Sequence, residues 1–453
     1  MGTITLRQAA QWCGGRVEEK YADVTFCGAS NDTRTLQPGQ LFVALKALRD
    51  GHDFVGAAFE KGAAAVLCSR VDGDYPAIIV EDTRIALGDI ARRERQRLGV
   101  QVVGITGSVG KSTTKEMIAC VLEGSFVVSK TPANHNNDIG MPMAVLAMPE
   151  STEVAVLEMG MNHFREIAYL AGIAKPDVAV IINIGTMHIE HLGSQEGILR
   201  AKLEILEGMG PEGKVLLNGD DRLLWNYGKT APVAITYFGA SNRECRVQAT
   251  DIREENGQLS MRVRHDGGDF ALTLPLEGIH YVSDAMAAVA VGLSMGITPE
   301  RIAERLAAFR NMEGRQEIFE AKGCTIIKDC YNAGPESMAA ALTVLGNRPG
   351  RHIAVLGDML ELGTSTQAEH YRVGRIAAEK AQIVLAFGPN ADRVVSGAVT
   401  GGMNPAMAKA FTDREKMAAA LQQMYRNGDV ILFKGSHGMK MELVLEQFLK
   451  EER

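Results

Sequence analysis

The sequence has few cysteines and no long hydrophobic run, and each shortage excludes a class of protein. Its seven cysteines are scattered and form no Cys-x-x-Cys pair, which argues against a disulfide framework or a zinc site and is typical of a reducing cytoplasm. No apolar stretch reaches the length that crosses a bilayer, and the first residues lack the pattern of a secretory signal. We therefore expect a cytoplasmic protein without stable membrane insertion.

The chain also lacks an excess of positive charge. It carries 48 lysine and arginine residues against 55 acidic ones, for a formal net charge of -7, and it has no basic stripe. This balance argues against nucleic acid as a partner. A hydrophobic content of 46% and a charged content of 23% are ordinary for a globular protein, and nothing in the sequence demands more than a monomer.

A glycine-rich turn at residues 106–113 follows an apolar run at 102–105 and opens a helical segment. Backbone N–H groups at such a turn, together with the dipole of the following helix, form an anion site. Lys111 can reach the outer phosphates and the Ser112 hydroxyl can bind Mg²⁺, so the turn predicts a nucleoside triphosphate site. The predicted nucleotide-binding residues are Thr106, Gly107, Ser108, Val109, Gly110, Lys111, Ser112 and Thr113.

One glycine of the usual P-loop is missing from this turn. The usual motif has its first glycine five positions before the second, and Ile105 stands at that position here. The turn is therefore a shortened variant. A regulatory or motor ATPase would carry the full motif, so the missing glycine argues against that class.

The chain is too long for a single hydrophobic core and suggests about three domains. Residues 1–98 mix short strands and helices. In residues 99–312, apolar strand-like runs alternate with helical segments, and a more polar β-like stretch follows between about 231 and 275. Residues 313–453 alternate strands and helices again. The predicted fold class is α/β with three domains: a small α/β N-terminal domain, a central P-loop-type parallel-sheet domain with an antiparallel β addition, and a Rossmann-like C-terminal domain.

Three further residues in the central domain could carry chemistry. Glu158 and His188 each follow an apolar strand-like run, and ligands of open α/β sheets bind at the carboxyl ends of strands. Glu158 is well placed to hold Mg²⁺, although a solvated acid after a strand is the alternative. His188 could bind a metal or a phosphate, or could simply pack. Lys202, on a predicted helix from about residue 195, reads on its own as an exposed helix lysine.

The segment at residues 131–142 is rich in side-chain amides and includes Asn136 and Asn137. It could be an ordinary polar loop. So many amides in one segment favour contact with a polar substrate.

Together these features resemble the Mur ligase family, the ATP-dependent amide-forming enzymes of bacterial peptidoglycan synthesis. The family's nucleotide loop reads Thr-Gly-[Ser/Thr]-x-Gly-Lys-[Ser/Thr]-Thr, as residues 106–113 do. Segments 28–34 and 39–46 resemble the UDP-sugar-binding domain of the members that add D-alanyl-D-alanine to UDP-N-acetylmuramoyl-tripeptide. Gly-Asp-Met-Leu-Glu-Leu-Gly at 357–363 and the segment 434–442 are similar to their C-terminal signatures. The Asp-Asn-Pro-Arg motif of the tripeptide-forming relatives is absent.

The resemblance implies ATP as cosubstrate and two Mg²⁺ ions. Ser112 and Glu158 would hold the first ion. His188 and Lys202 would hold the second, with Lys202 carrying a CO2-derived carbamate. Because carbamylation needs a neutral amine, the site has to lower the pKa of this lysine.

The resemblance also implies a set of catalytic and nucleotide contacts. Lys111 and Arg315 would neutralise charge on the transferred phosphoryl group. His280 and Asp284 match the start of a nucleotide-binding helix, but Asp284 replaces an asparagine of the family, and capping of that helix is an equal interpretation. Asp329 matches a ribose-binding acid.

UDP-N-acetylmuramoyl-tripeptide and D-alanyl-D-alanine are the implied substrates. The tripeptide carboxylate would attack the γ-phosphate of ATP, and the dipeptide amine would displace phosphate from the acyl phosphate. Another Mur ligase or a folylpolyglutamate-type ligase is the alternative activity. The predicted substrate-binding residues are Ser30, Asp32, Arg34, Lys46, Asn136, Asn137, Tyr331 and Asn332.

Overall fold

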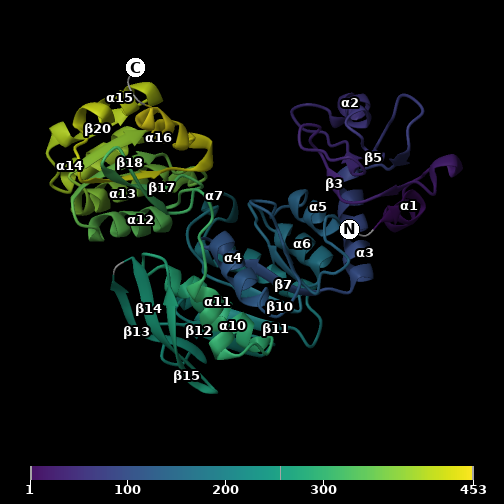
Figure 1. Cartoon of the computed structure of the whole chain (residues 1–453), viewed down its shortest axis with the longest axis horizontal. Helices are drawn as coiled ribbons and strands as arrows, with labels where there is room; N and C mark the ends of the chain where they lie inside the picture. Colours follow the sequence, from purple (N-terminus) through teal and green to yellow (C-terminus); the bar gives the residue numbers. More distant parts are fainter. Residues whose placement is uncertain (1–2, 256, 451–453) are drawn as a thin grey trace.

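The computed structural model describes residues 3–255 and 257–450. Its larger sheets form three units, and Figure 1 shows the N-terminal unit (purple) and the C-terminal unit (yellow) both placed beside the central one. The predicted three-part α/β architecture is confirmed. In the part of the chain that the structure describes, no helix combines the length and apolar character needed to span a membrane.

The N-terminal unit is built on a four-stranded parallel sheet of order β3-β4-β5-β6. Its last helix leads into the central unit. This helix is capped at its start by Asp82, whose side chain accepts the N–H groups of Arg84 and Ile85, and at its end by Gly99 in the left-handed conformation (φ 65°). The elements are β1 (Ile4–Thr5), α1 (Leu6–Cys13), β2 (Thr25–Phe26), β3 (Ala29–Ser30), β4 (Leu41–Val43), α2 (Val55–Glu60), β5 (Ala65–Cys68), β6 (Ala77–Ile79) and α3 (Thr83–Leu98), with 3-10 turns at Glu19–Tyr21 and Gly51–Phe54.

The central unit contains a nine-stranded sheet of order β15-β14-β13-β12-β11-β10-β7-β9-β8. From β8 to β13 in this order, each strand pairs in parallel with its neighbour, while β13, β14 and β15 form the antiparallel addition that the polar β-like stretch predicted. The strands are β7 (Gln101–Thr106), β8 (Val128–Lys130), β9 (Val154–Glu158), β10 (Val178–Ile181), β11 (Lys214–Asn218), β12 (Ile235–Gly239), β13 (Val247–Glu255), β14 (Gln258–His265) and β15 (Gly268–Leu274).

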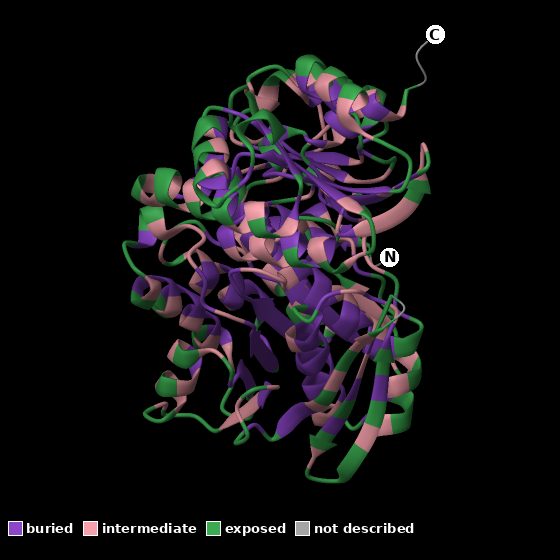
Figure 2. Cartoon of the chain, turned by 90° about the vertical axis from the view of Figure 1, so that its left-hand side faces the viewer, coloured by how far each residue is buried: buried purple, intermediate pink, exposed green. Residues whose placement is uncertain are grey.

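Helices cover both faces of this sheet, and a hydrophobic core lies on each face. Figure 2 shows the inner strands of this sheet as buried, whereas the antiparallel strands β13, β14 and β15 carry exposed residues as well. Strands enclosed on both faces need apolar residues at every position, which is why β9 and β10 read as continuous hydrophobic runs. The helices are α4 (Lys111–Leu122), α5 (Gly140–Leu146), α6 (Glu166–Ala174), α7 (Ile189–Leu192), α8 (Gln195–Leu203), α9 (Arg222–Gly228), α10 (Tyr281–Ser294) and α11 (Pro299–Ala307), with a 3-10 turn at Glu204–Gly208.

The C-terminal unit has a six-stranded sheet of order β16-β17-β21-β18-β19-β20, parallel except for β16. Its elements are β16 (Glu317–Ala321), β17 (Cys324–Asp329), α12 (Pro335–Asn347), β18 (Arg351–Gly357), α13 (Thr366–Lys380), β19 (Ile383–Phe387), α14 (Ala391–Thr400), β20 (Ala408–Phe411), α15 (Arg414–Met424), β21 (Asp429–Lys434) and α16 (Glu442–Leu449), with 3-10 turns at Gly363–Ser365, Pro405–Met407 and His437–Met439.

The strand order of the central sheet brings the predicted site together. Strand β7 lies between β10 and β9, with Thr106 opposite Ile181 and Ile105 opposite Glu158. The glycine-rich turn, Glu158 and the loop after β10 therefore leave the sheet at one edge, where parallel α/β folds bind ligands.

Candidate active site

A cavity of about 770 Å³ lies between this edge of the central sheet and the C-terminal unit. The glycine-rich turn, Glu158 and His188 line it from the central side. Arg315 and Asp329 line it from the C-terminal side. Residues predicted from distant parts of the sequence thus meet around one space.

The turn itself is ordered around Lys111, the first residue of α4. Its Nζ donates to the carbonyls of Gly107 (2.8 Å) and Ser108 (3.2 Å). Burial lowers the pKa of Lys111, and the nearby Arg315 adds to this, while Glu158 acts against it. A desolvated amine beside a helix N-terminus provides a strong binding position for phosphate oxygens.

The side chain of Asn183 also holds this turn, and this role was not predicted from the sequence. The N–H groups of Ser108 and Val109 both donate to Oδ1 of Asn183 at 3.0 Å, and Asn183 returns a bond from Nδ2 to the Val109 carbonyl. Asn183 follows β10, so its place after an apolar strand was the one available signal. It fixes the backbone that faces the cavity.

One carboxylate oxygen of Glu158 is hydrogen-bonded and the other has no partner in the part of the chain that the structure describes. Oε1 accepts a bond from Nδ2 of Asn136 at 2.7 Å, and Oε2 is buried with no partner among the described residues. A buried carboxylate oxygen without a donor is costly unless a cation binds it. Asn137, next in sequence to Asn136, does something else: its Oδ1 accepts the N–H groups of Ile139 and Gly140 at the start of α5, and the residue lies outside the cavity lining in the described structure.

Lys202 is buried, so its interpretation as an exposed helix lysine is wrong. It lies on α8, whose first turn is fixed by the Ser194 side chain accepting the N–H of Gly197. Burial holds the pKa of Lys202 well below its usual range, and the charge of Lys111 lowers it further. Among the described residues Lys202 is not part of the cavity lining itself, but it is close enough to Lys111 to feel its charge.

His188 lines the cavity and contacts the C-terminal unit. Its Nδ1 lies 2.9 Å from Oε2 of Glu361 without hydrogen-bond alignment, and the proximity of His188 lowers the pKa of Glu361. Both residues have positive φ (64° and 63°), which is rare outside glycine. Glu361 belongs to the segment 357–363, and it was not predicted from the sequence as a site residue.

No group of three or more His, Cys, Asp or Glu side chains suited to a metal occurs in the described part of the chain. Any Mg²⁺ here therefore needs other oxygen ligands, such as hydroxyl, phosphate or carbamate oxygens. The free oxygen of Glu158 and the nearby Ser112 hydroxyl fit such a site, since both line the cavity.

Asp284 is buried beneath the glycine-rich turn. Its Oδ1 accepts the Thr114 hydroxyl at 2.8 Å, so the capping interpretation of this side chain is wrong. A Cβ on Gly110 would lie 2.5 Å from the same oxygen, and for that reason the turn needs glycine there. Burial raises the pKa of Asp284 to about 7. Burial lowers the pKa of neighbouring His280 to about 4.

This raised pKa predicts a pH-dependent stability. The folded state binds the Asp284 proton more tightly than the unfolded state, whose carboxyl has a pKa near 3.8. The stabilisation is complete below that value and is lost as pH rises through about 7. Asp284→Asn removes the titrating group. As pH rises from about 5 to 8, the free energy of unfolding of the variant should therefore increase relative to that of the wild type by on the order of a few kcal/mol.

Thermal unfolding across this pH range measures the effect. Asp72→Asn, in an exposed loop, serves as the control and should follow the wild type. A difference between Asp284→Asn and wild type that stays constant with pH would contradict the prediction.

On the C-terminal side, Arg315 reaches across to the nucleotide turn. Its Nη2 donates to Oγ of Ser112 at 3.0 Å, and its guanidinium lies 4.1 Å from the ring centre of Tyr331. This contact places a positive charge beside the predicted phosphate position.

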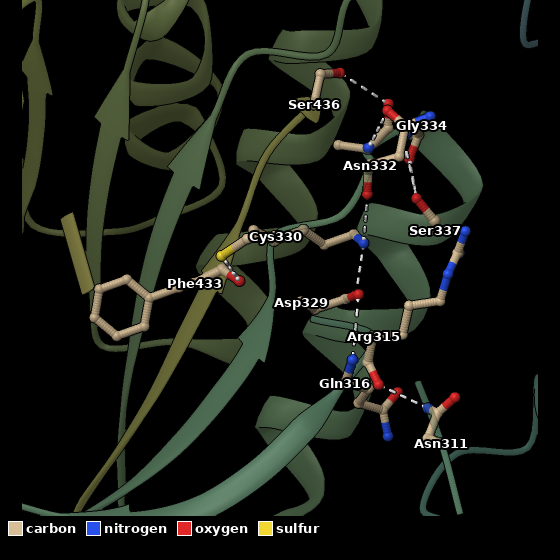
Figure 3. A network of polar contacts seen from close by, with 12 residues as sticks. Asn311, Arg315, Gln316, Asp329, Cys330, Asn332, Gly334, Ser337, Phe433 and Ser436 are labelled. Atoms are coloured by element: carbon tan, nitrogen blue, oxygen red, sulfur yellow. Dashed lines mark hydrogen bonds and ion pairs between the residues drawn. The ribbon is translucent and has the colours of Figure 1, made fainter. Parts of the chain in front are cut away.

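The neighbouring polar network of the C-terminal unit fixes Asp329 and Asn332 (Figure 3). Lys434 donates from Nζ to Oδ2 of Asp329 at 2.6 Å and to the carbonyl of Asn332 at 3.0 Å. The N–H of Gln316 donates to the other Asp329 oxygen at 3.3 Å. Both residues line the cavity, and their roles in binding nucleotide and substrate stay predictions.

The predicted substrate residues of the N-terminal unit do not join this cavity. Asp32 forms an ion pair with Arg34 at 2.6 Å, and Ser30 bonds the backbone of Asp32. Lys46 pairs with Asp50 through the backbone. Their role in binding stays a prediction.

A glycine-rich phosphate turn, a free carboxylate oxygen and an arginine that faces them from the C-terminal unit are parts that an ATP-dependent ligase needs. Two family models match the chain: the Mur ligase middle domain over residues 105–292 and the Mur ligase, glutamate ligase domain over residues 314–437. The chain belongs to the Mur ligase family, as its motifs indicated.

Relatives match along nearly the whole chain. It is 39% identical to the UDP-N-acetylmuramoyl-tripeptide--D-alanyl-D-alanine ligase of Bacillus subtilis (strain 168), covering 98% of both proteins. Among solved structures, MurF from Acinetobacter baumannii matches with a TM-score of 0.91 and 31% identity over 100% of both chains. MurF ligase from Thermotoga maritima in complex with ADP matches with a TM-score of 0.82 and 31% identity, over 94% of this chain and 97% of that one.

Proposed function

We propose that this protein is an ATP-dependent ligase that joins D-alanyl-D-alanine to UDP-N-acetylmuramoyl-tripeptide. The observation that carries the proposal is the 39% identity to a ligase of that name over 98% of both chains. The contact between Glu361 and His188 adds to it, because it brings the segment 357–363, which resembles the C-terminal signature of these ligases, to the cavity.

ATP would bind with its phosphates on the turn at residues 106–113. Lys111 and Arg315 then face the transferred phosphoryl group from opposite units and stabilise its spreading charge. His280, Asp284 and Asp329 also line this cavity and would contact the nucleotide. Little covalent chemistry is asked of the protein, so positioning of the carboxylate against the γ-phosphate supplies most of the rate enhancement.

Two Mg²⁺ ions belong to this proposal. Ser112 and Glu158 would hold one, and His188 with a carbamylated Lys202 the other, and the ions would neutralise phosphate and carboxylate charge. The buried amine of Lys202, whose pKa is lowered, meets the requirement of a neutral amine for carbamylation.

The dipeptide would enter from a second cavity, of about 680 Å³, which shares Leu360 and Glu361 with the first. Glu190 and Glu361 give this cavity two carboxylates that can attract the dipeptide ammonium group. Transfer of the γ-phosphoryl group to the tripeptide carboxylate releases ADP and gives the acyl phosphate. Once the ammonium group has lost a proton to solvent, the amine attacks the acyl carbon, forms the amide and releases phosphate. Closure between the units would keep water from the acyl phosphate.

The remaining assignments are proposals as well. The domains would be residues 1–98 for the UDP-sugar, 99–312 for ATP and 313–453 for closure and the dipeptide. Ser30, Asp32, Arg34 and Lys46 would bind the UDP-sugar, with Asn136, Tyr331 and Asn332 nearer the reacting end. We place the enzyme in the cytoplasm, where ATP is available, and as a monomer.

Phosphate release tests the function. We expect release with UDP-N-acetylmuramoyl-tripeptide and ATP to depend strongly on D-alanyl-D-alanine, with one amide formed per phosphate. Single amino acids and a folate with glutamate are the comparison substrates, because they separate the other Mur ligases and folylpolyglutamate-type enzymes. Release that ignores the dipeptide would contradict the proposal.

A further inference from the structure

The loop after β10, residues 182–188, is held from two sides. We call it the β10 loop. It carries His188 into the cavity at one end and braces the nucleotide turn at the other. Its outer side contacts the C-terminal unit, although more than a hundred residues separate the two in sequence.

On the inner side the β10 loop is bonded to the nucleotide turn. Asn183 accepts two backbone N–H groups of that turn, and the N–H of Gly185 donates to Oγ of Ser108 at 2.8 Å. A Cβ on Gly185 would lie 3.1 Å from Cβ of Ser108 and 3.2 Å from Oε1 of Glu336. The loop thus fits tightly between the two partners.

On the outer side the partner is Glu336, in the first turn of α12. Its Oε1 accepts the Thr186 hydroxyl at 2.9 Å and the Thr186 N–H at 3.2 Å. Its Oε2 is buried with no partner among the described residues, and the side chain also borders the cavity. Hydrogen bonds to a carboxylate are among the stronger ones, so the two bonds from Thr186 hold this loop firmly against α12.

These contacts form one chain of bonds from the C-terminal unit to the nucleotide turn. We propose that Glu336 is a positioning residue through which docking of the C-terminal unit fixes the β10 loop, and with it His188 and the nucleotide turn. Phosphoryl transfer then depends on the docked arrangement. This inference rests on the proposed ligase function for its kinetic consequences only, since the bonding itself is independent of the substrate.

The kinetic test combines variants of both partners. Glu336→Ala should lower kcat by roughly 10- to 100-fold, because a displacement of about 1 Å can cost that much, while KM for ATP changes by less than about threefold. Thr186→Val should lower kcat, and Thr186→Ser, which keeps the hydroxyl, should restore it. The double variant Glu336→Ala/Thr186→Val should be no slower than Glu336→Ala alone, because both changes break one interaction.

Arg348→Ala is the matched control. Arg348 lies at the end of the same helix and pairs with Glu277 of the central unit, so this variant also removes an ion pair between the units, but one that does not touch the β10 loop. It should keep kcat within about twofold of wild type. Effects of Glu336→Ala and Thr186→Val that multiply, or an equal loss in Arg348→Ala, would overturn the inference.

Amide hydrogen exchange provides a measurement that needs no ligation. Exchange in segments 182–188 and 107–110 should be faster in Glu336→Ala than in wild type and unchanged in Arg348→Ala. Unchanged exchange in Glu336→Ala would overturn the inference even if the enzyme is active. A wild type without ligase activity would instead refute the proposed function, and the exchange result would still decide the role of Glu336.

Discussion

Replacing Lys202 with alanine should lower the rate of ligation by about 1000-fold, and acetate or formate should restore part of the activity. The proposed carbamate places a carboxylate-like group at the end of this buried side chain, and truncation leaves space that a small carboxylic acid can fill. Burial and the charge of Lys111 hold the pKa of Lys202 low, so the native amine is suited to react with CO2.

Initial rates with saturating substrates, with and without added acid, measure this effect. Lys130→Ala is the control, because that lysine is more exposed and pairs with Glu116 away from the cavity. Near-normal turnover of Lys202→Ala would contradict the proposal that a carbamate on Lys202 takes part in the reaction. If no small acid restores the lost activity, the reaction requires the lysine side chain itself and the carbamate proposal is contradicted.

Lys111→Met should lower kcat/KM by about 1000-fold, because a buried positive charge beside the transferred phosphoryl group is removed. The long apolar side chain of methionine preserves most of the packing at the start of α4. Nucleotide binding followed by calorimetry and steady-state rates together separate lost binding from lost catalysis. Lys130→Met, with the same change at an exposed site, should behave as wild type, and a small effect in Lys111→Met would contradict the phosphate role of this turn.

The local features of the fold could be predicted from the sequence because each reflects its own residues. The apolar runs of β7, β9 and β10 are continuous since the sheet is covered on both faces. The nucleotide turn carries its signature in one contiguous stretch. Strand β20, at the edge of the C-terminal sheet, has no such run, because Lys409 and Ala410 are exposed.

The pairings between distant segments could not be predicted. Asp284 accepts a bond from Thr114, and Thr186 donates to Glu336, each across more than a hundred residues. Asn136 and Asn137 look alike in sequence, yet one bonds Glu158 and the other starts a helix. Only the three-dimensional arrangement distinguishes such roles.

The central claim is that a phosphoryl group of ATP activates the tripeptide carboxylate, and oxygen-18 labelling tests it most directly. UDP-N-acetylmuramoyl-tripeptide labelled at its terminal carboxylate is incubated with the protein, ATP and D-alanyl-D-alanine, and the released phosphate is analysed by mass spectrometry. The account predicts one labelled oxygen in phosphate for each amide formed, together with ADP. Unlabelled phosphate, or release of AMP and pyrophosphate, would contradict it.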